Sequence, residues 1–381
     1  MNKIVVEGWR GINHSYALVN QWQLLEMTKR NIDLRHLDVP YISPKWNRLA
    51  NSSGLSLEQM LIIDNIKKPE PGEEIDISYR IAYPYNLAPS KSARNYVFGT
   101  SESQSKEIHF INRDPKKANK WDPNLFIVTP SRWSKIGFLK AGFDEHRVMV
   151  VPHGVDPETY FPLEPIVRNN WRKSMGIEED QFVLLSLGTC YFNKGVELLV
   201  VAFAILRDKY PNLRLILKDQ NNLYYNRSGR DVISDVEKSP YYRQINKNNL
   251  DEIIYISRNL STIELRTFYG ACDCYVSPYR AEGFNLTPLE AAACGTPILV
   301  TAGGSTDDYF HPLMGFQIEG RVQSKGLDTI IEPNLDSLIQ QLTELIEGRK
   351  SVGGNCGSKY VHTKFSWARV CDQLLRVMQI D

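Results

Sequence analysis

Residues 280–308 read RAEGFNLTPLEAAACGTPILVTAGGSTDD. An apolar stretch at 275–277 predicts a strand before it, the residues from Pro288 onward predict a helix, and 297–301 predict the next strand. A strand, a glycine-containing loop, a helix and a second strand in this order form a βαβ unit, whose parallel strands are covered by the helix. The stretch therefore predicts a parallel α/β fold.

The same alternation continues on both sides of this stretch. The other predicted strands are 3–6, 75–79, 107–111, 125–129, 147–151, 182–187, 213–217 and 253–256. The predicted helices are 15–30, 130–142, 196–207, 261–270 and 288–293. Residues 152–170 are rich in proline, which is typical of a linker between domains. We therefore expect two doubly wound, Rossmann-like α/β domains facing a cleft, residues 1–155 and 156–361, with ligands at the carboxyl ends of the strands.

Composition excludes several other classes of protein. The 381 residues include 45 Lys and Arg against 44 Asp and Glu, a net charge of +1, which argues against a dedicated nucleic-acid binder. The six cysteines form no C-x-x-C pair and the histidines are scattered, so neither a disulfide framework nor a structural zinc site is expected. The apolar start ends at Glu7, and the longest apolar run, 198–206, is too short to span a bilayer. We expect a cytoplasmic protein.

The segment around Pro288 also predicts an anion site. Thr287 is expected at the N-cap, Pro288 at N1 and Glu290 at N3 of the helix, which is the pattern of a capping box. The N–H groups of the first turn would then point at the loop 283–287, where they suit a diphosphate. The alternative is that this capping box is purely structural, which is the commoner case for such a box taken alone.

The joint pattern resembles the donor-binding segment of a known enzyme family. This family comprises the retaining glycosyltransferases of the GT-B fold, called family 4 or glycosyl transferases group 1. Its pattern is Glu, seven residues, Glu, then E-A-x-A-x-G-x-P and Gly-Gly, and it is matched here from Glu282 and Glu290 to the AGG at 302–304. Also similar to the family are VTPSRWSKIGFLKAGFDEHRVMVVPHGVD (128–156), LGTCYFNKGVELLVVAF (187–203) and FSWARVCDQLL (365–375). The resemblance is good from about residue 125 onward and weak before it.

The resemblance implies a role for each matching residue. Glu290 would hold the nucleotide ribose and Glu282 would lie beside the donor sugar. Lys194 would neutralise the departing diphosphate, although a lysine before a glycine turn is more often a solvated charge. The backbone amides of Phe284, Asn285 and Leu286 would meet the sugar and the distal phosphate, and Gly283 and Thr287 would belong to the same donor-binding loop. The resemblance also implies that a closing helix, 362–381, packs back onto the first domain.

One departure from the family concerns its second cation. The family usually has Arg where this chain has Thr189. Lys218, at the end of a predicted strand, and Arg280 are the candidates to replace it. Lys218 is equally well interpreted as a surface lysine at a strand end. No Asp-x-Asp occurs in the chain, so we expect charge neutralisation by the protein, with no metal and no other cofactor required.

The base of the nucleotide is expected at the loop after strand 253–256, formed by Arg258, Asn259 and Leu260. Arg258 would stack on or hydrogen-bond to the base, unless it is only an exposed loop arginine. Uracil is the expected base because uridine diphosphate sugars predominate in the family.

In the first domain, Gly8-Trp9-Arg10-Gly11 takes the place of the family's glycine-rich loop, and Gly11 is expected beside the donor. His14 begins the following helix and would face the acceptor. Many family members carry a His after a middle strand of this domain, but none occurs at 80–84 here. Tyr83 and Glu102 are the proposed substitutes on the acceptor side, although a lone Glu in such a loop is more often a surface residue.

The segment 132–140 is basic and aromatic at helical spacing. It predicts either a weak docking face for an anionic membrane or, more often for such a pattern, a core-packing helix with solvated lysines. Peripheral contact with the inner face of the membrane is thus one expectation for this chain.

We therefore expect a retaining glycosyltransferase that moves a hexose, with glucose as the first choice, from a UDP-sugar to a saccharide or lipid-linked saccharide in polysaccharide or glycoconjugate synthesis. The alternatives are a sugar-nucleotide epimerase on the same fold, a phosphorylase, which the short chain disfavours, and a non-catalytic protein that binds a nucleotide sugar or glycan. The acceptor, the linkage and the identity of the hexose are not encoded in these motifs.

Overall fold

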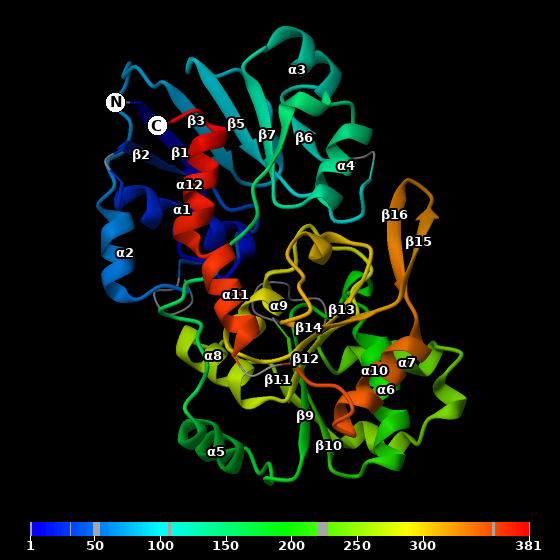
Figure 1. Cartoon of the computed structure of the whole chain (residues 1–381). Coiled ribbons are helices and arrows are strands. Elements are labelled where there is room, and N and C mark those ends of the chain that lie inside the picture. The colour runs from blue at the N-terminus through cyan, green and yellow to red at the C-terminus, as the bar shows by residue number, and fades with distance from the viewer. Residues whose placement is uncertain are drawn as a thin grey trace. The chain divides into compact units, whose positions relative to one another are not determined.

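The computed structural model describes residues 2–30, 32–48, 54–105, 108–219, 228–352 and 355–380 (Figure 1). Its internal contacts divide the chain into two compact units. The first unit consists of the residues up to Gly154, Gly326–Asp328 and the residues from Trp367 onward. The second consists of Val155–Lys325 and Thr329–Ser366.

The first unit is built on a parallel sheet. Its strands lie in the order β2-β1-β3-β5-β7-β8. They are β1 (Lys3–Gly8), β2 (Asp33–Asp38), β3 (Ile77–Ile81), β5 (Arg94–Phe98), β7 (Leu125–Thr129) and β8 (Val148–Val150), with a small pair β4 (Tyr85–Asn86) and β6 (Phe110–Ile111) beside them. The helices are α1 (Ser15–Thr28), α2 (Leu57–Asp64), α3 (Pro115–Trp121), α4 (Arg132–Lys140) and α12 (Trp367–Val377), and a 3-10 turn covers Glu145–Arg147.

Strands β2 and β5 were not among the predicted strands. Residues 33–38 read DLRHLD, and this polar sequence forms an edge strand in which only Leu34 and His36 are buried. Strand β3 lies two residues later than expected, and only Phe110–Ile111 of the predicted strand 107–111 is a strand, while Glu107 lies outside the described residues. The weak resemblance before residue 125 thus coincides with the part where strand prediction was poorest.

The second unit has its own parallel sheet, in the order β11-β10-β9-β12-β13-β14. Its strands are β9 (Phe182–Leu187), β10 (Leu213–Lys218), β11 (Ile253–Ile256), β12 (Cys274–Ser277), β13 (Ile298–Thr301) and β14 (Gly315–Ile318). The chain adds strands on one side of β9 and then on the other, so the direction of winding switches between β9 and β12. Open α/β sheets bind their ligands at such a switch point.

Helices cover both faces of this second sheet. Leu184 of β9 belongs to a hydrophobic cluster with α6 and α10, whereas its neighbours Val183 and Leu185 belong to a cluster with α8, α9 and α11. The helices are α5 (Pro165–Ser174), α6 (Val196–Lys209), α7 (Asp231–Lys238), α8 (Thr262–Ala271), α9 (Leu286–Ala293), α10 (Leu335–Ile346) and α11 (Cys356–Phe365). The 3-10 turns are Phe192–Lys194, Tyr242–Gln244, Lys247–Glu252 and Ser305–Asp308. Burial on both faces explains why these strands are continuously apolar.

A hairpin, β15 (Gly320–Lys325) and β16 (Asp328–Pro333), follows the last strand of the second sheet. Every residue of β15 is exposed, whereas Ile330 and Ile331 of β16 are buried. The hairpin was not predicted, because GRVQSK lacks the apolar alternation by which strands are identified.

The end of the chain is shared between the two units. Helix α11 packs on α9, and Val155 pairs with Ser366. Helix α12 then lies beside α1 in the first unit (Figure 1), where Trp367 stacks on Trp22 with the ring centres 6.4 Å apart. Asp372 of α12 also accepts from Arg30 at 2.6 Å. In the described segments, every helix falls short of the length and apolar character that a bilayer crossing requires.

Candidate active site

A pocket opens at the carboxyl ends of β9, β10 and β12 in the second unit, beside the switch point of the sheet. Its lining includes Gly188, Thr189, Cys190, Lys194, Lys218, Ser277 and Asn285. Three of the predicted site residues, Lys194, Lys218 and Asn285, therefore meet in one pocket although they come from three different strand exits.

Lys194 forms an ion pair with Glu282, another of the predicted site residues. It ends the 3-10 turn after β9, and its Nζ forms a short ion pair with Oε1 of Glu282, in the loop between β12 and α9. The Lys194 side chain is 23% exposed and that of Glu282 only 8%. The pair is thus largely removed from water, where charges interact strongly and where each needs the other as a counter-charge.

Lys218 is the second cation of the pocket. It ends β10, it is buried, and its Nζ donates to the backbone oxygen of Asp219. Burial is the main reason that the pKa of this ammonium is lowered to about 8; the charge of Asp219 opposes this shift, and that of Arg258 adds to it. Lys218 is therefore mostly charged at pH 7 but close to losing its proton. The interpretation as a surface lysine is wrong because the side chain is buried.

The start of α9 differs from the predicted capping box. The helix begins at Leu286 after Asn285, whose φ of 69° lies in the left-handed region. The Asn285 side chain donates to Ser277 at 2.9 Å, and its backbone oxygen accepts from Tyr309 at 2.8 Å. Thr287 accepts from Tyr275 at 2.7 Å and is not the N-cap. The helix starts two residues earlier than predicted, because Asn285 adopts a left-handed conformation that no local sequence pattern indicates.

The other residues of this loop contribute mainly through their backbones. Phe284 is buried with its ring against Tyr309, 5.0 Å between centres, so its side chain belongs to the core. Gly283 is buried and Leu286 is half-buried.

Glu290 faces a different set of groups from the pocket lining. It accepts from the hydroxyl of Tyr269 at 2.8 Å and also from Tyr160. Burial raises the pKa of this carboxyl to about 7, although both hydrogen bonds act in the opposite direction. Because α9 begins at Leu286, Glu290 is not the N3 member of a capping box, and near neutral pH its carboxyl is present in both protonation states.

Arg280 is committed to protein partners. It is 4% exposed, and its guanidinium binds both carboxylate oxygens of Glu332 at 2.9 Å, together with Glu197 at 2.5 Å. Two carboxylates already neutralise this cation, so it is not placed as a replacement for the family arginine at Thr189. Within the part of the chain that the structure describes, Lys218 is the candidate that lines the pocket.

The loop after β11 is divided between surface and core. Arg258 is exposed and pairs with Glu264 at 2.6 Å, and Asn259 accepts from Arg258 through its backbone oxygen at 3.3 Å. The Arg258 guanidinium lowers the pKa of the Glu264 carboxyl to about 2. Leu260 is buried in the cluster around α8 and α9, so its side chain packs in the core.

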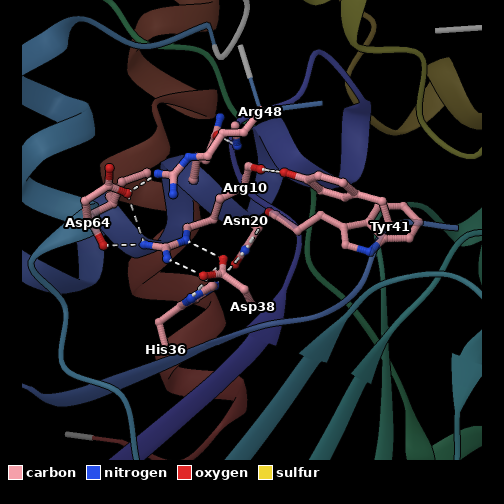
Figure 2. A network of polar contacts seen from close by, with 11 residues as sticks. Arg10, Asn20, His36, Asp38, Tyr41, Arg48 and Asp64 are labelled. Carbon is pink, nitrogen blue, oxygen red and sulfur yellow. Dashed lines mark hydrogen bonds and ion pairs between the residues drawn. The ribbon is translucent and has the colours of Figure 1, made fainter. Parts of the chain in front are cut away.

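Gly11, which was predicted to lie beside the donor, is in the turn after β1 of the first unit. Gly11 has a φ of +76°, and its amide donates to Gln21 at 2.6 Å. Figure 2 shows why this turn is fixed: Arg10, next to Gly11, lies between Asp38 and Asp64, and binds both oxygens of Asp38 at 2.8 and 2.7 Å. The turn after β1 is thus held by a buried arginine instead of by a run of glycines.

The three acceptor-side candidates occupy different places in this unit. His14 caps α1 by accepting from the amide of Tyr16 at 3.1 Å, and burial lowers its pKa to about 4, so it is neutral. Tyr83 is 37% exposed and contacts His109 at 3.2 Å. Glu102 is exposed, and its backbone oxygen accepts from Trp133 at 2.6 Å.

Several neighbours of the site were not predicted. Ser277 and Cys190 line the pocket, Tyr160 and Tyr269 bind Glu290, and Glu332 binds Arg280. Ser277 ends a predicted strand and Cys190 lies three residues after another, so strand exits were a usable signal for them. Glu332 lies 52 residues from Arg280 on the unpredicted hairpin, and no local pattern indicates that contact.

Comparison with known proteins agrees with this architecture. Residues 167–349 match the family described as Glycosyl transferases group 1. The D-inositol 3-phosphate glycosyltransferase of Pseudarthrobacter chlorophenolicus is 31% identical over 182 residues, 47% of this chain and 40% of that protein. The lipopolysaccharide 1,2-N-acetylglucosaminetransferase of Salmonella typhimurium is 26% identical over 266 residues, 68% of this chain and 63% of that protein. The chain spans less than half the length of the first curated relatives that it matches.

Among solved structures, HepE of Anabaena in complex with UDP and glucose superposes with a TM-score of 0.67 at 15% identity, over 100% of both chains. At this identity the likeness concerns the fold. The matched family segment contains the pocket, both of its lysines and both glutamates of the motif. Residues 167–349 therefore belong to the glycosyl transferases group 1 family, and the chain as a whole has the GT-B fold.

Proposed function

We propose that the chain transfers a sugar from a nucleotide-sugar donor to an acceptor hydroxyl, with the donor diphosphate in the pocket of the second unit. The observation that carries this proposal is the meeting of Lys194 and Lys218 at the carboxyl ends of adjacent strands, beside the buried carboxylate of Glu282. Two cations in one pocket suit a ligand of two negative groups, and the adjoining carboxylate suits hydroxyls.

The chemistry requires stabilisation of a growing negative charge. When the bond between the anomeric carbon and the phosphate oxygen breaks, its electron pair goes to the diphosphate. Fixed cations stabilise that charge without reorganisation, and we assign this work to Lys194 and Lys218. Glu282 would position the sugar, and Glu290 would hold the ribose hydroxyls.

For the acceptor step we propose front-face attack with retention of configuration. The acceptor oxygen forms the new bond to the anomeric carbon, and its proton goes to an oxygen of the leaving diphosphate. This assignment needs no protein nucleophile. Glu282 supports it, because a carboxylate held by an ion pair to Lys194 suits positioning better than covalent attack.

The finer specificity is also proposed. We take a UDP-sugar, with UDP-glucose first, as the donor, and a saccharide or lipid-linked saccharide as the acceptor. The HepE structure holds UDP and glucose, whereas the curated relatives are named for inositol phosphate and lipopolysaccharide substrates. The base would lie beside Arg258 and Asn259, at the exit of β11.

We further propose a cytoplasmic enzyme that needs no metal, because two lysines supply the positive charge. Contact with the inner membrane face would involve α4, whose Arg132, Ile136 and Lys140 are exposed. Trp133 and Phe138 of this helix are buried, so the aromatic anchors of a docking face are missing from its surface. This favours the core-packing interpretation of α4.

A second candidate is a protein that binds nucleotide sugars without turnover. Thr189 lines the pocket where the family usually has an arginine, and Lys218 is partly deprotonated at moderately alkaline pH. Both features leave less positive charge for the leaving diphosphate than an arginine would supply.

One experiment separates these candidates. The purified chain is incubated with UDP-glucose, with and without EDTA, and UDP release is measured beside UDP binding. Slow hydrolysis that survives EDTA and is lost in Lys194→Ala supports the proposal. Binding of UDP without release, with or without sugar acceptors, supports the binding protein. Failure to bind UDP-glucose, GDP-mannose or UDP-N-acetylglucosamine overturns the donor site.

A further inference from the structure

The loop that carries Lys194 and the loop that carries Glu282 are joined along their backbones. The backbone oxygen of Asn193 accepts from the amides of Arg280 at 2.7 Å and Ala281 at 3.2 Å. The Asn193 side chain donates to the backbone oxygen of Ala281 at 3.3 Å. The two charged side chains of the ion pair are therefore placed by one continuous set of contacts.

Arg280 lies at the centre of these contacts. Besides Glu332 and Glu197, its guanidinium donates to the backbone oxygen of Phe192 at 2.9 Å, and its central carbon lies 4.2 Å from the Phe192 ring centre. Phe192 opens the 3-10 turn that ends at Lys194. A single side chain thus holds the Lys194 turn while its own backbone leads, two residues later, to Glu282.

The β15–β16 hairpin holds Arg280 from the other side. Glu332 of β16 accepts both parallel hydrogen bonds of the guanidinium, and the amide of Ile331 donates to the backbone oxygen of Arg280 at 2.8 Å. Lys325 of β15 lies over the Phe192 ring, with Nζ 4.5 Å from its centre. The hairpin therefore contacts both the loop that leads to Glu282 and the turn that ends at Lys194, through side chains and through its backbone.

We propose that Arg280 is a positioning residue that holds Lys194 and Glu282 in their paired geometry, with the hairpin carboxylate of Glu332 fixing Arg280 in turn. This inference rests on the proposed transferase function. Its physical basis is the planar guanidinium of Arg280. Two of its nitrogens, Nε and Nη2, donate to Glu332, while the third, Nη1, pairs with Glu197 and donates to the backbone oxygen of Phe192. A lysine is a point charge and cannot make this set of bonds.

The consequence is a specific kinetic signature. Arg280 is buried against protein groups, so its loss should leave ground-state nucleotide binding nearly intact. A small displacement of Lys194 should reduce stabilisation of the leaving group, because misplacement by about 1 Å can cost about 10²-fold in rate. Arg280→Lys keeps the charge and removes the fork, which makes it the informative substitution.

Arg172 offers a matched control. It is 3% exposed, pairs with Asp273 at 3.0 Å and donates to backbone oxygens in the same unit, away from the pocket lining. Arg172→Lys should lower the melting temperature without changing turnover per folded molecule.

The test measures kcat and KM for UDP-glucose hydrolysis, UDP affinity, and amide hydrogen exchange in the full chain. In Arg280→Lys we expect kcat to fall about 30- to 100-fold, UDP affinity to change less than about threefold, and exchange to accelerate at 191–195 and 278–283. Glu332→Gln, which keeps the shape of the partner, should give a smaller loss of the same kind. If Arg280→Lys does not fold, Glu332→Gln carries the test.

Two results would overturn the inference. One is a kcat in Arg280→Lys within threefold of the wild type, and the other is an equal loss in UDP affinity and kcat, which would make Arg280 a direct ligand. If the wild type turns over no nucleotide sugar, the proposed function fails. The exchange measurement then still decides on Arg280, because unchanged exchange at both loops contradicts its positioning role.

Discussion

Lys194 and Glu282 pair at the edge of the pocket although they are 88 residues apart in sequence. In this pair the Glu282 carboxylate lies beside the Lys194 ammonium, where a phosphate oxygen of the donor could also lie. In the proposed site the diphosphate would lie beside Lys194 and the sugar beside Glu282, so that the pair joins the two parts of the donor. The predictions below follow from this relationship and from the groups around it.

Lys194→Ala should lower turnover far more than nucleotide binding. The lysine acts on charge that develops as the leaving group departs, so its removal should cost about 10²- to 10³-fold in kcat. UDP affinity should fall less, since Lys218 remains in the pocket. Steady-state hydrolysis of UDP-glucose and titration with UDP measure the two quantities.

Lys209→Ala is the control for this prediction. Lys209 is 65% exposed and pairs with Glu347 on the surface of the same unit, and its loss should change neither quantity. Equal losses of kcat and affinity in Lys194→Ala would mean that the lysine contributes uniform binding and has no special role in the transition state.

The affinity for UDP should decrease as the pH rises through about 8. Burial holds the pKa of Lys218 near this value, so the side chain is mostly ammonium at pH 7 and mostly neutral amine at pH 9. The charge that binds the diphosphate is present below the pKa and is lost above it. Calorimetric titration with UDP between pH 7 and 9 measures this dependence.

The control is Lys218→Met, which should bind UDP more weakly at pH 7 and show a flatter pH profile. Protonation of UDP itself affects binding to both proteins in the same way, so the comparison with Lys218→Met also corrects for it. The same slope in the variant and the wild type would assign the pH dependence to some other group.

The parts of the site that could be predicted from the sequence are those defined by residues close together in the chain. The spacing of Glu282 and Glu290 and the strand exits at Lys194 and Lys218 are local patterns, and the structure brings both lysines to one pocket. The Arg280 to Glu332 contact joins a loop to a hairpin without apolar alternation, and only the folded chain reveals it.

The errors in the fold have similarly physical causes. The predicted capping box at Thr287 was wrong because Asn285 adopts a left-handed conformation and starts the helix earlier. Strand β2 was missed because an edge strand needs few apolar residues, and its sequence DLRHLD resembles a loop. Five strands of the second sheet were predicted, because burial on both faces favours apolar runs, whereas the edge strand β14, with the sequence GFQI, was missed.

Glu290→Gln should stabilise the protein at pH 8 while weakening UDP binding. The pKa of this carboxyl is raised from 4.5 to about 7 by burial. A raised carboxyl pKa contributes stability that is full below pH 4.5 and is lost as the pH rises through 7. The substitution removes the cost of the buried charge, so the melting temperature should rise by a few degrees at pH 8 and by less at pH 5.

The expected loss of UDP affinity in Glu290→Gln is about tenfold or more, because a hydrogen bond from ribose to a charged group is replaced by one to an amide. Thermal melts at both pH values and UDP titration provide the measurements. A stabilised variant with unchanged UDP affinity would remove Glu290 from the ribose site and leave it as a buried partner of Tyr160 and Tyr269.

Gly195→Ala tests the close contact between the two loops of the site. Gly195 follows Lys194, has a φ of +63°, and a Cβ there would lie 1.9 Å from the backbone oxygen of Pro278. Gly176→Ala is the matched control, because Gly176 has a φ of +67° and its Cβ would meet nothing within 4 Å. The control should cost about 1 kcal/mol from left-handed strain alone.

Gly195→Ala should cost about 1–3 kcal/mol more than this control, since the backbone of Pro278 has to move. That movement also displaces the loop leading to Glu282, so turnover should fall while the control keeps wild-type turnover. Urea unfolding and UDP-glucose hydrolysis measure the two effects. If both variants lose the same stability and retain activity, the contact at Pro278 gives way easily, and the loops are not held at a fixed separation by Gly195.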